Sequence, residues 1–245
     1  MMMKKILFAF CWLCFMAGPA YSADLSVACA ANFTGTMKEL AALYEEETGR
    51  SVQCSFGSTG MLYGQITKGA PYDLFLAADE KRPAMLFEQG LAESPSTYAK
   101  GEVVLWSKNK NLGAIPTWDE VLCCMDVKRV GIANPKTAPY GKRAAEAMAT
   151  AHIYTKTEPK LAFGKSVGAA FQYAYSGAAD VSFAALSQAL TSKGAKGVYW
   201  PIPLADPVNQ SACVLKTGRT DTANDFLQWM TTASARTIIR KYGYE

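Results

Sequence analysis

The sequence has few of the side chains on which enzymes and metal centres depend. Its 245 residues include a single histidine, His152, which we expect at a helix end or on the surface rather than in the role of a base. No phosphate-loop or dinucleotide fingerprint is present, and GSTG at residues 57–60 lacks the central serine of the G-x-S-x-G nucleophile elbow. An enzymatic function is therefore the weakest interpretation of the sequence. The one enzymatic hypothesis that we keep is a secreted hydrolase with Ser58 as nucleophile.

A strong charge of either sign is also missing. Lys and Arg total 25 against 21 Asp and Glu, and removal of a leader that holds Lys4 and Lys5 would leave 23 against 21. The basic residues are dispersed and form no run, which argues against a nucleic-acid partner. A nearly neutral chain attracts an anion only weakly at long range.

The first 22 residues have the composition of a secretory signal. Lys4 and Lys5 precede an unbroken apolar run at residues 6–17, and Ala20-Tyr21-Ser22 is a small-x-small cleavage sequence. The run is too short to span a bilayer, and no later stretch is long and apolar enough. No cysteine follows the run in a setting for lipid attachment. We expect cleavage after Ser22 and a free, soluble, periplasmic product.

Five of the seven cysteines lie beyond the leader, at positions 29, 54, 123, 124 and 213. An odd number leaves at least one thiol free or paired between chains. Cys29 and Cys54 stand near the ends of expected neighbouring strands, so the sequence allows a disulfide between them without requiring it. For Cys123 and Cys124 we favour a helix face over a metal or redox site, because no Cys-X-X-Cys or Cys/His spacing accompanies them.

Apolar patterning after the leader alternates between strand and helix. Strands are expected at 25–29, 52–56, 74–78, 103–106, 129–133, 180–184, 198–201 and 212–215. Helices are expected at 37–48, 59–68, from about 83 to 90, at 118–125, 140–151 and 166–175, and twice at the C-terminal end. Repeated strand–helix units predict a mainly parallel α/β fold.

Four short polar loops precede expected helices: AANFTG (30–35), GSTG (57–60), APYG (138–141) and GKSVG (164–168). A helix start leaves backbone N–H groups unpaired and carries a partial positive charge, so it is a ready anion site. Ligands of open α/β sheets bind outside the carboxyl ends of the strands, where these loops are expected. Four converging loops would enclose a small oxyanion without any charged side chain.

The spacing of the loops predicts two lobes that face each other across a cleft, because two loops come from the first third of the chain and two from the middle. We expect the chain to cross near 100–106 and to return near 206–215. The first lobe would then hold residues 23–101 and 206–245, and the second lobe 102–205.

Longer stretches around these loops resemble the periplasmic molybdate-binding proteins, the extracytoplasmic receptors of molybdate ABC transporters. The similarity covers essentially the whole chain beyond the leader. Its most specific part is SFGSTGMLYGQITKGAPYDLFLAADEK (55–81), and the other parts are AANFTGTMKELA, GIANPKTAPYGKRA, KSVGAAFQYAYSGAADVSF and RKYGY. The resemblance implies a two-lobed periplasmic-binding-protein fold of type II, with mainly parallel sheets and the ligand in the cleft.

The resemblance also implies a set of anion contacts, which are Asn32, Thr59, Tyr140 and the backbone N–H of Val167, with Ala31 and Ser58 beside them. A tyrosine that some relatives carry after the strand at 180–184 is missing, because the segment here reads VSFAALS. A branch of the family that uses Asn32 and Tyr140 instead fits better. From its own motif alone, Thr59 is favoured as a plain helix cap, and only the expected convergence of four such loops reverses this. The other interpretations are a cap or turn former for Asn32, a surface aromatic for Tyr140 and a core residue for Val167.

A site made only of donors favours a fully deprotonated dianion over hydrogen phosphate, whose own O–H needs an acceptor. Lys136, Lys142, Arg143 and Lys165 flank the loops, and we expect them to act as rim charges rather than ligands. Together with this chemistry, the resemblance implies binding of molybdate, and of tungstate as well, and delivery to a membrane permease. We expect a monomeric protein without a cofactor. The alternative is a receptor for another tetrahedral oxyanion such as sulfate.

Overall fold

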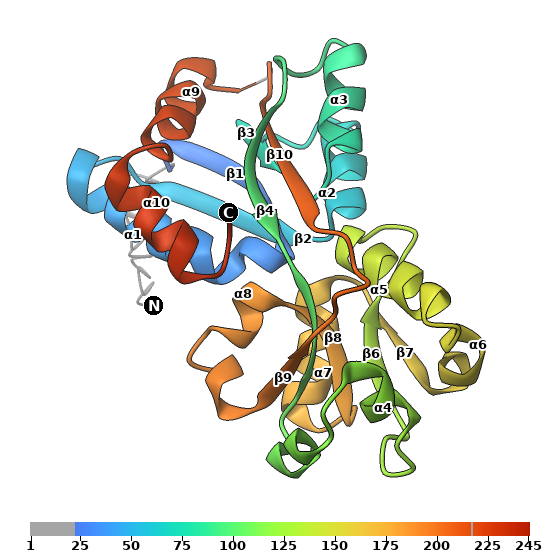
Figure 1. Cartoon of the computed structure of the whole chain (residues 1–245). Coiled ribbons are helices and arrows are strands. Elements are labelled where there is room, and N and C mark those ends of the chain that lie inside the picture. The colour runs from blue at the N-terminus through green and yellow to red at the C-terminus, as the bar shows by residue number, and fades with distance from the viewer. Residues whose placement is uncertain (1–22, 217) are drawn as a thin grey trace, which may run out of the picture.

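The computed structural model describes residues 23–216 and 218–245. The expected signal at residues 1–22 lies outside the described residues. Figure 1 shows two lobes joined by two extended segments of the chain. Each lobe is built on one five-stranded sheet with helices packed against it. In the described part of the chain, no helix combines the length and apolarity needed to cross a membrane.

The first lobe holds a sheet in the order β2-β1-β3-β10-β4. Its strands are β1 (Leu25–Ala30), β2 (Val52–Gly57), β3 (Leu74–Leu76), β4 (Ser96–Gly101) and β10 (Val208–Val214). Its helices are α1 (Thr34–Thr48), α2 (Thr59–Ile66), α3 (Lys81–Glu88), α9 (Thr220–Trp229) and α10 (Ala233–Lys241), with a 3₁₀ turn η1 (Ala31–Phe33) before α1. In α1 the buried residues Met37, Leu40 and Tyr44 recur at helical spacing, which packs one face of this helix inward.

The second lobe holds a sheet in the order β7-β6-β8-β5-β9. Its strands are β5 (Val103–Ser107), β6 (Val130–Ala133), β7 (Leu161–Gly164), β8 (Val181–Ala185) and β9 (Val198–Pro201). Its helices are α4 (Trp118–Cys123), α5 (Pro139–Thr150), α6 (Tyr154–Thr157), α7 (Val167–Ser176) and α8 (Leu186–Ala189), with 3₁₀ turns η2 (Lys110–Ala114), η3 (Glu158–Lys160) and η4 (Gly194–Lys196). The apolar strands β5, β6 and β8 are buried along their whole length, as expected for a sheet covered on both faces.

The chain passes between the lobes twice. It leaves the first lobe where β4 ends at Gly101 and β5 begins at Val103, and it returns between Pro201 and Val208. The C-terminal helices α9 and α10 consequently pack beside β1 and α1 in the first lobe (Figure 1). The predicted lobe boundaries at 101/102 and 205/206 fall in these two connections and stay a prediction.

Both sheets are mixed, which corrects the expectation of mainly parallel sheets. β1 pairs in parallel with β2 and β3, and β6 does so with β7 and β8. β10 and β5 instead pair antiparallel with both of their neighbours. The reason is the path of the chain: β5 and β10 enter their lobes from the cleft and run away from it, whereas the strands that carry the polar loops run toward it.

Apolar packing is continuous across the cleft. The first lobe has its own core around Leu40, Phe226 and Ile239. The core of the second lobe, however, also includes Ala30 and Ala78 from the ends of first-lobe strands. The lobes are therefore in direct contact at the point where the polar loops meet.

Candidate functional site

The first polar loop leaves the carboxyl end of β1 and becomes the 3₁₀ turn η1. Asn32 in this turn is 2% exposed. The hydroxyl of Thr34 donates to the carbonyl of Ala31 at 2.8 Å, which holds the turn closed. N–H groups at such a start have no partner within the helix, so η1 brings backbone donors to the cleft.

The second loop connects β2 to α2. Ser58 is the cap of α2, because its Oγ accepts a hydrogen bond from the N–H of Met61 at 3.4 Å. Thr59 is the first residue of the helix, and its Oγ1 accepts from the N–H of Ala78 at 3.1 Å. The interpretation of Thr59 as a plain cap is therefore wrong. Since a hydroxyl both accepts and donates, each of these two side chains still has its own proton to donate.

The third and fourth loops lie in the second lobe and follow β6 and β7. Pro139 is the first residue of α5 and has no N–H, so Tyr140 carries the first backbone donor of that helix. Ser166 caps α7 by accepting from the N–H of Ala169 at 3.2 Å. Val167 is the first residue of α7, is 5% exposed, and offers a ligand only its backbone.

All four loops line one cavity of about 10 Å³ between the lobes. Its walls are formed by Ala30, Ala31, Asn32, Gly57, Ser58, Thr59, Ala78, Ala138, Pro139, Tyr140 and Val167. The structure thus brings all six sequence-predicted residues together, although they come from four separate segments. None of these described wall residues carries a charge. Pockets for organic ligands measure roughly 300–1,000 Å³, so this cavity suits a small ion rather than an organic solute.

The side-chain amide of Asn32 has no hydrogen left to donate to an anion. Its Nδ2 donates to Oε1 of Gln210 at 2.7 Å and to the hydroxyl of Tyr244 at 3.0 Å. Both hydrogens of the amide are therefore used within the protein. The donor that Asn32 still offers to the cavity is its backbone N–H.

The hydroxyl of Tyr140 lies in the same buried region, where it accepts from Nε2 of Gln210 at 3.4 Å. Burial raises the pKa of Tyr140 well above its ordinary value, and the neighbouring Tyr244 and Tyr98 raise it further. Burial also raises the pKa of Tyr244 to about 12. These phenols are neutral at physiological pH, so they add no negative charge that would repel an anion from the cavity.

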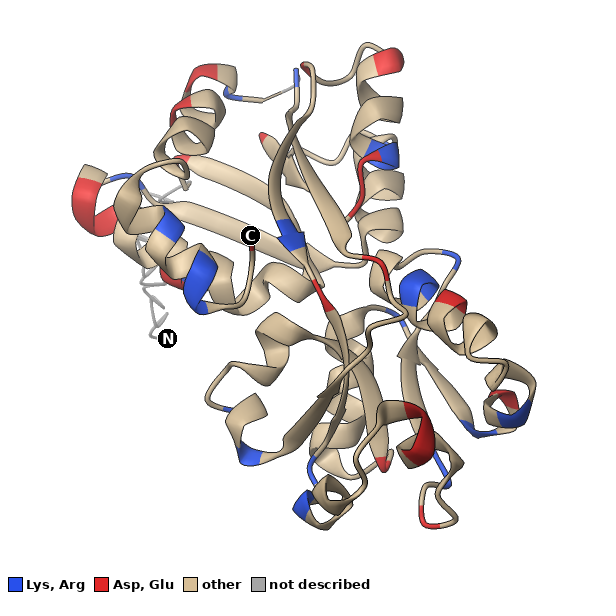
Figure 2. Cartoon of the chain, viewed as in Figure 1, with Lys and Arg blue, Asp and Glu red and all other residues tan. Residues whose placement is uncertain are grey.

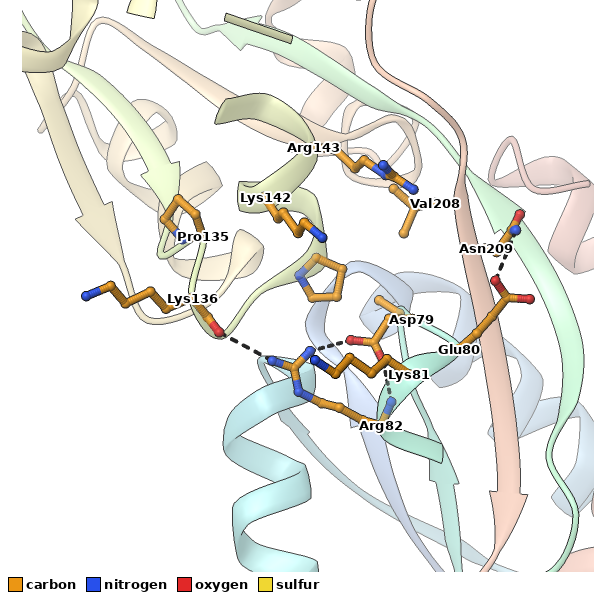
Figure 3. Close-up of a pocket in the computed structure, with 12 residues that line it drawn as sticks. Asp79, Glu80, Lys81, Arg82, Pro135, Lys136, Lys142, Arg143, Val208 and Asn209 are labelled. Carbon is orange, nitrogen blue, oxygen red and sulfur yellow. Dashed lines mark hydrogen bonds and ion pairs between the residues drawn. The ribbon is translucent and has the colours of Figure 1, made fainter. Parts of the chain in front are cut away.

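A second, charged hollow of about 260 Å³ opens beside the cavity, with which it shares Ala78 and Pro139. We call this hollow the vestibule; its charged lining residues are Asp79, Glu80, Lys81, Arg82, Lys136, Lys142 and Arg143. Figure 3 shows that the guanidinium of Arg82 bridges the lobes, paired with Asp79 in the first and with the carbonyl of Lys136 in the second at 3.3 Å.

Three of the four expected rim cations, Lys136, Lys142 and Arg143, line the vestibule, whereas Lys165 is exposed outside it. Over the described chain, Lys and Arg are scattered across both lobes with Asp and Glu among them (Figure 2). The charged residues near the site therefore lie outside the cavity, whose described walls carry none.

The lobes are closed on each other at the cavity. The N–H of Gly60 in α2 donates across the cleft to the carbonyl of Thr137 at 2.9 Å. A Cβ on Gly60 would lie 2.9 Å from that same carbonyl oxygen, which no real side chain tolerates. This close approach is the reason that a glycine follows Thr59.

The five described cysteines are free thiols. Cys54 lies opposite Val27 rather than opposite Cys29 in the register of β1 and β2, so the two sulfurs are not a disulfide pair here. Cys123 ends α4, whose inner face is formed by buried Trp118, Val121 and Leu122, as the helix-face interpretation predicted. Cys124 follows the end of the helix, so the interpretation holds for Cys123 alone. No group of three or more His, Cys, Asp or Glu side chains in the described residues is placed to hold a metal ion.

The single histidine lies far from the candidate site. His152 follows the C-terminal end of α5, in a left-handed backbone conformation with φ 56°. Tyr140 stands at the other end of this helix, about 18 Å away at 1.5 Å per residue. A serine–histidine pair with Ser58 is therefore not assembled.

The fold and the site together define a two-lobed solute-binding protein. The chain matches the family described as bacterial extracellular solute-binding protein over residues 25–245, and it belongs to that family. It is 43% identical to the molybdate-binding protein ModA of Rhodobacter capsulatus over 234 residues, which is 94% of this chain and 91% of the relative. It is 40% identical to ModA of Azotobacter vinelandii over 235 residues, covering 94% and 92%.

Solved structures agree with this placement. The periplasmic molybdate-binding protein of Azotobacter vinelandii superposes with a TM-score of 0.85 at 36% identity, covering 91% of this chain and 99% of that one. The sulfate-binding protein SubI of Mycobacterium tuberculosis H37Rv superposes with a TM-score of 0.75 at 16% identity, covering 90% and 85%. The second likeness shows the fold alone.

Sequence reasoning missed four residues that contact the site from behind, which are Tyr98, Ser187, Gln210 and Tyr244. Gln210 gave little signal, because it is one of three consecutive polar residues in β10, which reads VNQSACV. Tyr244 belongs to the RKYGY motif that carries part of the family resemblance, but the motif alone assigns it no contact. Tyr98 and Ser187 give no sequence signal.

Proposed function

We propose that this protein binds molybdate, and tungstate as well, in the periplasm and delivers the ion to the permease of an ABC transporter. The observation that carries the proposal is the cavity where four helix starts from both lobes meet without a charged side chain. The identities of 43% and 40% to molybdate-binding relatives support the choice of ion. The ion is cargo, and the proposal includes neither a cofactor nor a catalytic step.

The proposed contacts are Asn32, Thr59, Tyr140 and Val167, with Ala31 and Ser58 beside them. The packing of these residues indicates which of them would donate a backbone N–H group and which a side-chain hydroxyl. Asn32, Tyr140 and Val167 would donate backbone N–H groups. Both amide hydrogens of Asn32 are already used, and the hydroxyl of Tyr140 lies behind the cavity against Gln210. Thr59 and Ser58 would donate hydroxyl protons. Each such bond to an anion is worth about 1.5–3 kcal/mol.

The donor set favours a fully ionised guest. A tetrahedral dianion presents only acceptors, so it satisfies every donor of the wall. Hydrogen phosphate would bring an O–H of its own, for which the wall offers no charged acceptor, and a buried unpaired O–H costs about 1–3 kcal/mol. Phosphate should therefore bind more weakly than molybdate although both are tetrahedral.

Isothermal titration of the purified protein with molybdate, tungstate, sulfate and phosphate tests the proposal. We expect heat and saturation at one ion per chain with molybdate and tungstate. No heat with either ion would refute it. Sulfate that displaces molybdate at equal concentration would instead establish the alternative receptor for another tetrahedral oxyanion.

We also propose that the protein is exported to the periplasm and that its leader is removed. The leader composition supports export and removal of residues 1–22, which N-terminal sequencing of the exported protein would test. We propose that the exported protein is a monomer that presents its closed form to the permease. Light scattering of the purified protein would test the monomeric state.

A further inference from the structure

A buried network of six polar side chains lies behind the cavity and joins the two lobes. Its members are Asn32, Tyr98, Gln210 and Tyr244 from the first lobe and Tyr140 and Ser187 from the second, and we call it the seam network. Each of the six residues is between 0% and 9% exposed. Their polar atoms are hydrogen-bonded to one another, and fully satisfied buried networks of this kind are rigid.

Gln210 on β10 is the centre of the seam network. Its Oε1 accepts from Nδ2 of Asn32 at 2.7 Å and from the hydroxyl of Tyr98 at 3.0 Å, and its Nε2 donates to the hydroxyl of Tyr140 at 3.4 Å. The reverse orientation of the amide would set two N–H₂ donors, those of Gln210 and Asn32, against each other. One fully buried side chain therefore joins the helix start of η1 to that of α5.

Ser187 provides a second tie between the lobes. Its hydroxyl donates to the carbonyl of Asn32 at 2.8 Å, and the hydroxyl of Tyr244 lies 2.9 Å from Ser187 Oγ. The crossing strand leaves room for these contacts: a Cβ at Gly101 would overlap the hydroxyl of Tyr140 and lie 2.8 Å from Nε2 of Gln210.

We propose that Gln210 is a positioning residue that fixes the width of the closed cavity and so selects the guest by size. The inference rests on the proposed function. Gln210 and Ser187 do not line the cavity, so their effect on a bound ion passes through Asn32 and Tyr140, which do. The tetrahedral oxyanions differ from one another mainly in radius, and a wall discriminates between radii only if it does not relax around the wrong guest.

The test substitutes Gln210→Met, which keeps the length of the side chain and removes its three hydrogen bonds. The dissociation constant for molybdate is measured by titration, and that for sulfate by displacement of molybdate. We expect molybdate binding to weaken about tenfold and sulfate binding by a smaller factor, so that the ratio of the two constants narrows. If sulfate does not displace molybdate from the wild-type protein, we expect it to displace molybdate from the Gln210→Met variant, because the two dissociation constants are then closer together.

Gln53→Met is the matched control, because it makes the same chemical change at an exposed position of β2. It should leave both constants unchanged. Ser187→Ala is the second variant, and it keeps the proposal testable if Gln210→Met does not fold, as judged by circular dichroism. Ser187 does not line the cavity but bonds the carbonyl of Asn32, so Ser187→Ala should also bring the two dissociation constants closer together.

A double-mutant cycle with Tyr140→Phe shows whether Gln210 acts through Tyr140. We expect the double variant to bind molybdate about as weakly as the weaker single variant, because both remove the same link. Fully additive losses, or an equal loss of affinity for molybdate and sulfate in Gln210→Met, would overturn the positioning role. A wild-type protein that binds neither ion would refute the proposed function itself, and that result is read before any variant is made.

Discussion

The cavity and the vestibule lie side by side in the cleft, but the cavity is lined by uncharged residues and the vestibule mainly by charged ones. The walls of the cavity carry no charge among the described residues, and its donors belong to helix starts and hydroxyls. The vestibule is lined by five Lys or Arg residues and two acids, several of them engaged in ion pairs. The vestibule offers an anion charged side chains, whereas the cavity offers it only uncharged donors.

The difference shows how the two tasks of capture and holding are divided. A charged side chain on a flexible stem attracts an ion at a distance but is screened by salt and does not fix a geometry. Backbone N–H groups at helix starts are rigid, and they keep their direction when water leaves the site. We therefore expect substitutions at the cavity to change the dissociation rate and substitutions at the vestibule to change the association rate.

The largest effect should come from Gly60→Ala. Its Cβ would lie 2.9 Å from the carbonyl oxygen and 3.1 Å from the Cα of Thr137, so the lobes could not close. Molybdate binding should weaken about a hundredfold or more, which is ~2.7 kcal/mol. The control is Gly64→Ala in the same helix, where a Cβ meets nothing within 4 Å. Equal affinity of the two variants in calorimetric titration would show that closure at Gly60 is not needed.

Removal of one hydroxyl from the wall should have the next largest effect. Thr59→Ala deletes a proposed donor to the anion and also the acceptor of the Ala78 N–H. We expect a loss of about 1.5–3 kcal/mol, or ten- to a hundredfold in affinity, mainly as faster dissociation. Thr59→Ser keeps the hydroxyl and should bind nearly as well as the wild type. An unchanged constant for Thr59→Ala would exclude this residue as a direct ligand.

Neutralising the vestibule should change affinity little. The Lys142 side chain is 66% exposed and lies 3.7 Å from Glu146, so Lys142→Gln should weaken binding by less than about threefold. The change should appear in the association rate and should disappear at high salt. Lys128→Gln, near the opposite end of β6, is the control. Stopped-flow measurements at two salt concentrations distinguish this result from a true ligand, whose loss would persist in salt.

The smallest effect should be that of pH on affinity. The pKa of Tyr140 is well above its ordinary value and that of Tyr244 is about 12, so the seam network stays neutral. Molybdate affinity should be constant between about pH 6 and about pH 9. The free energy of unfolding should instead fall as the pH rises from the ordinary tyrosine value of 10.0 toward 12, because the unfolded chain loses these protons first. Titrations across this range, with denaturant unfolding beside them, check both statements.

Much of the fold follows from local pattern, but the direction of its strands does not. The helix at Thr34–Thr48 and the stop at Gly49, with φ 73°, follow from periodicity and from the glycine that ends it. β4 was not predicted because STYAKG is largely polar, and the four-residue strand β7 was not predicted either. The antiparallel pairing of β5 and β10 depends on where the chain enters each lobe, which no local pattern contains.

The candidate site was predictable as a set of backbone positions but not as a set of side-chain directions. Ser58, Thr59 and Val167 stand at helix starts that sequence signals mark. Whether the polar ends of Asn32 and Tyr140 face the cavity or the seam depends on Gln210, which is 178 residues from Asn32 along the chain. Such a contact becomes visible only when the two lobes are placed together.

The most direct test of the account is the crystal structure of the protein with molybdate, located by the anomalous scattering of the metal. We expect the molybdenum peak in the small cavity, with its oxygens bonded to the backbone N–H groups of Asn32, Tyr140 and Val167 and to the hydroxyl of Thr59. A peak in the vestibule, with Arg82 or Lys142 bonded to the ion, would contradict the account.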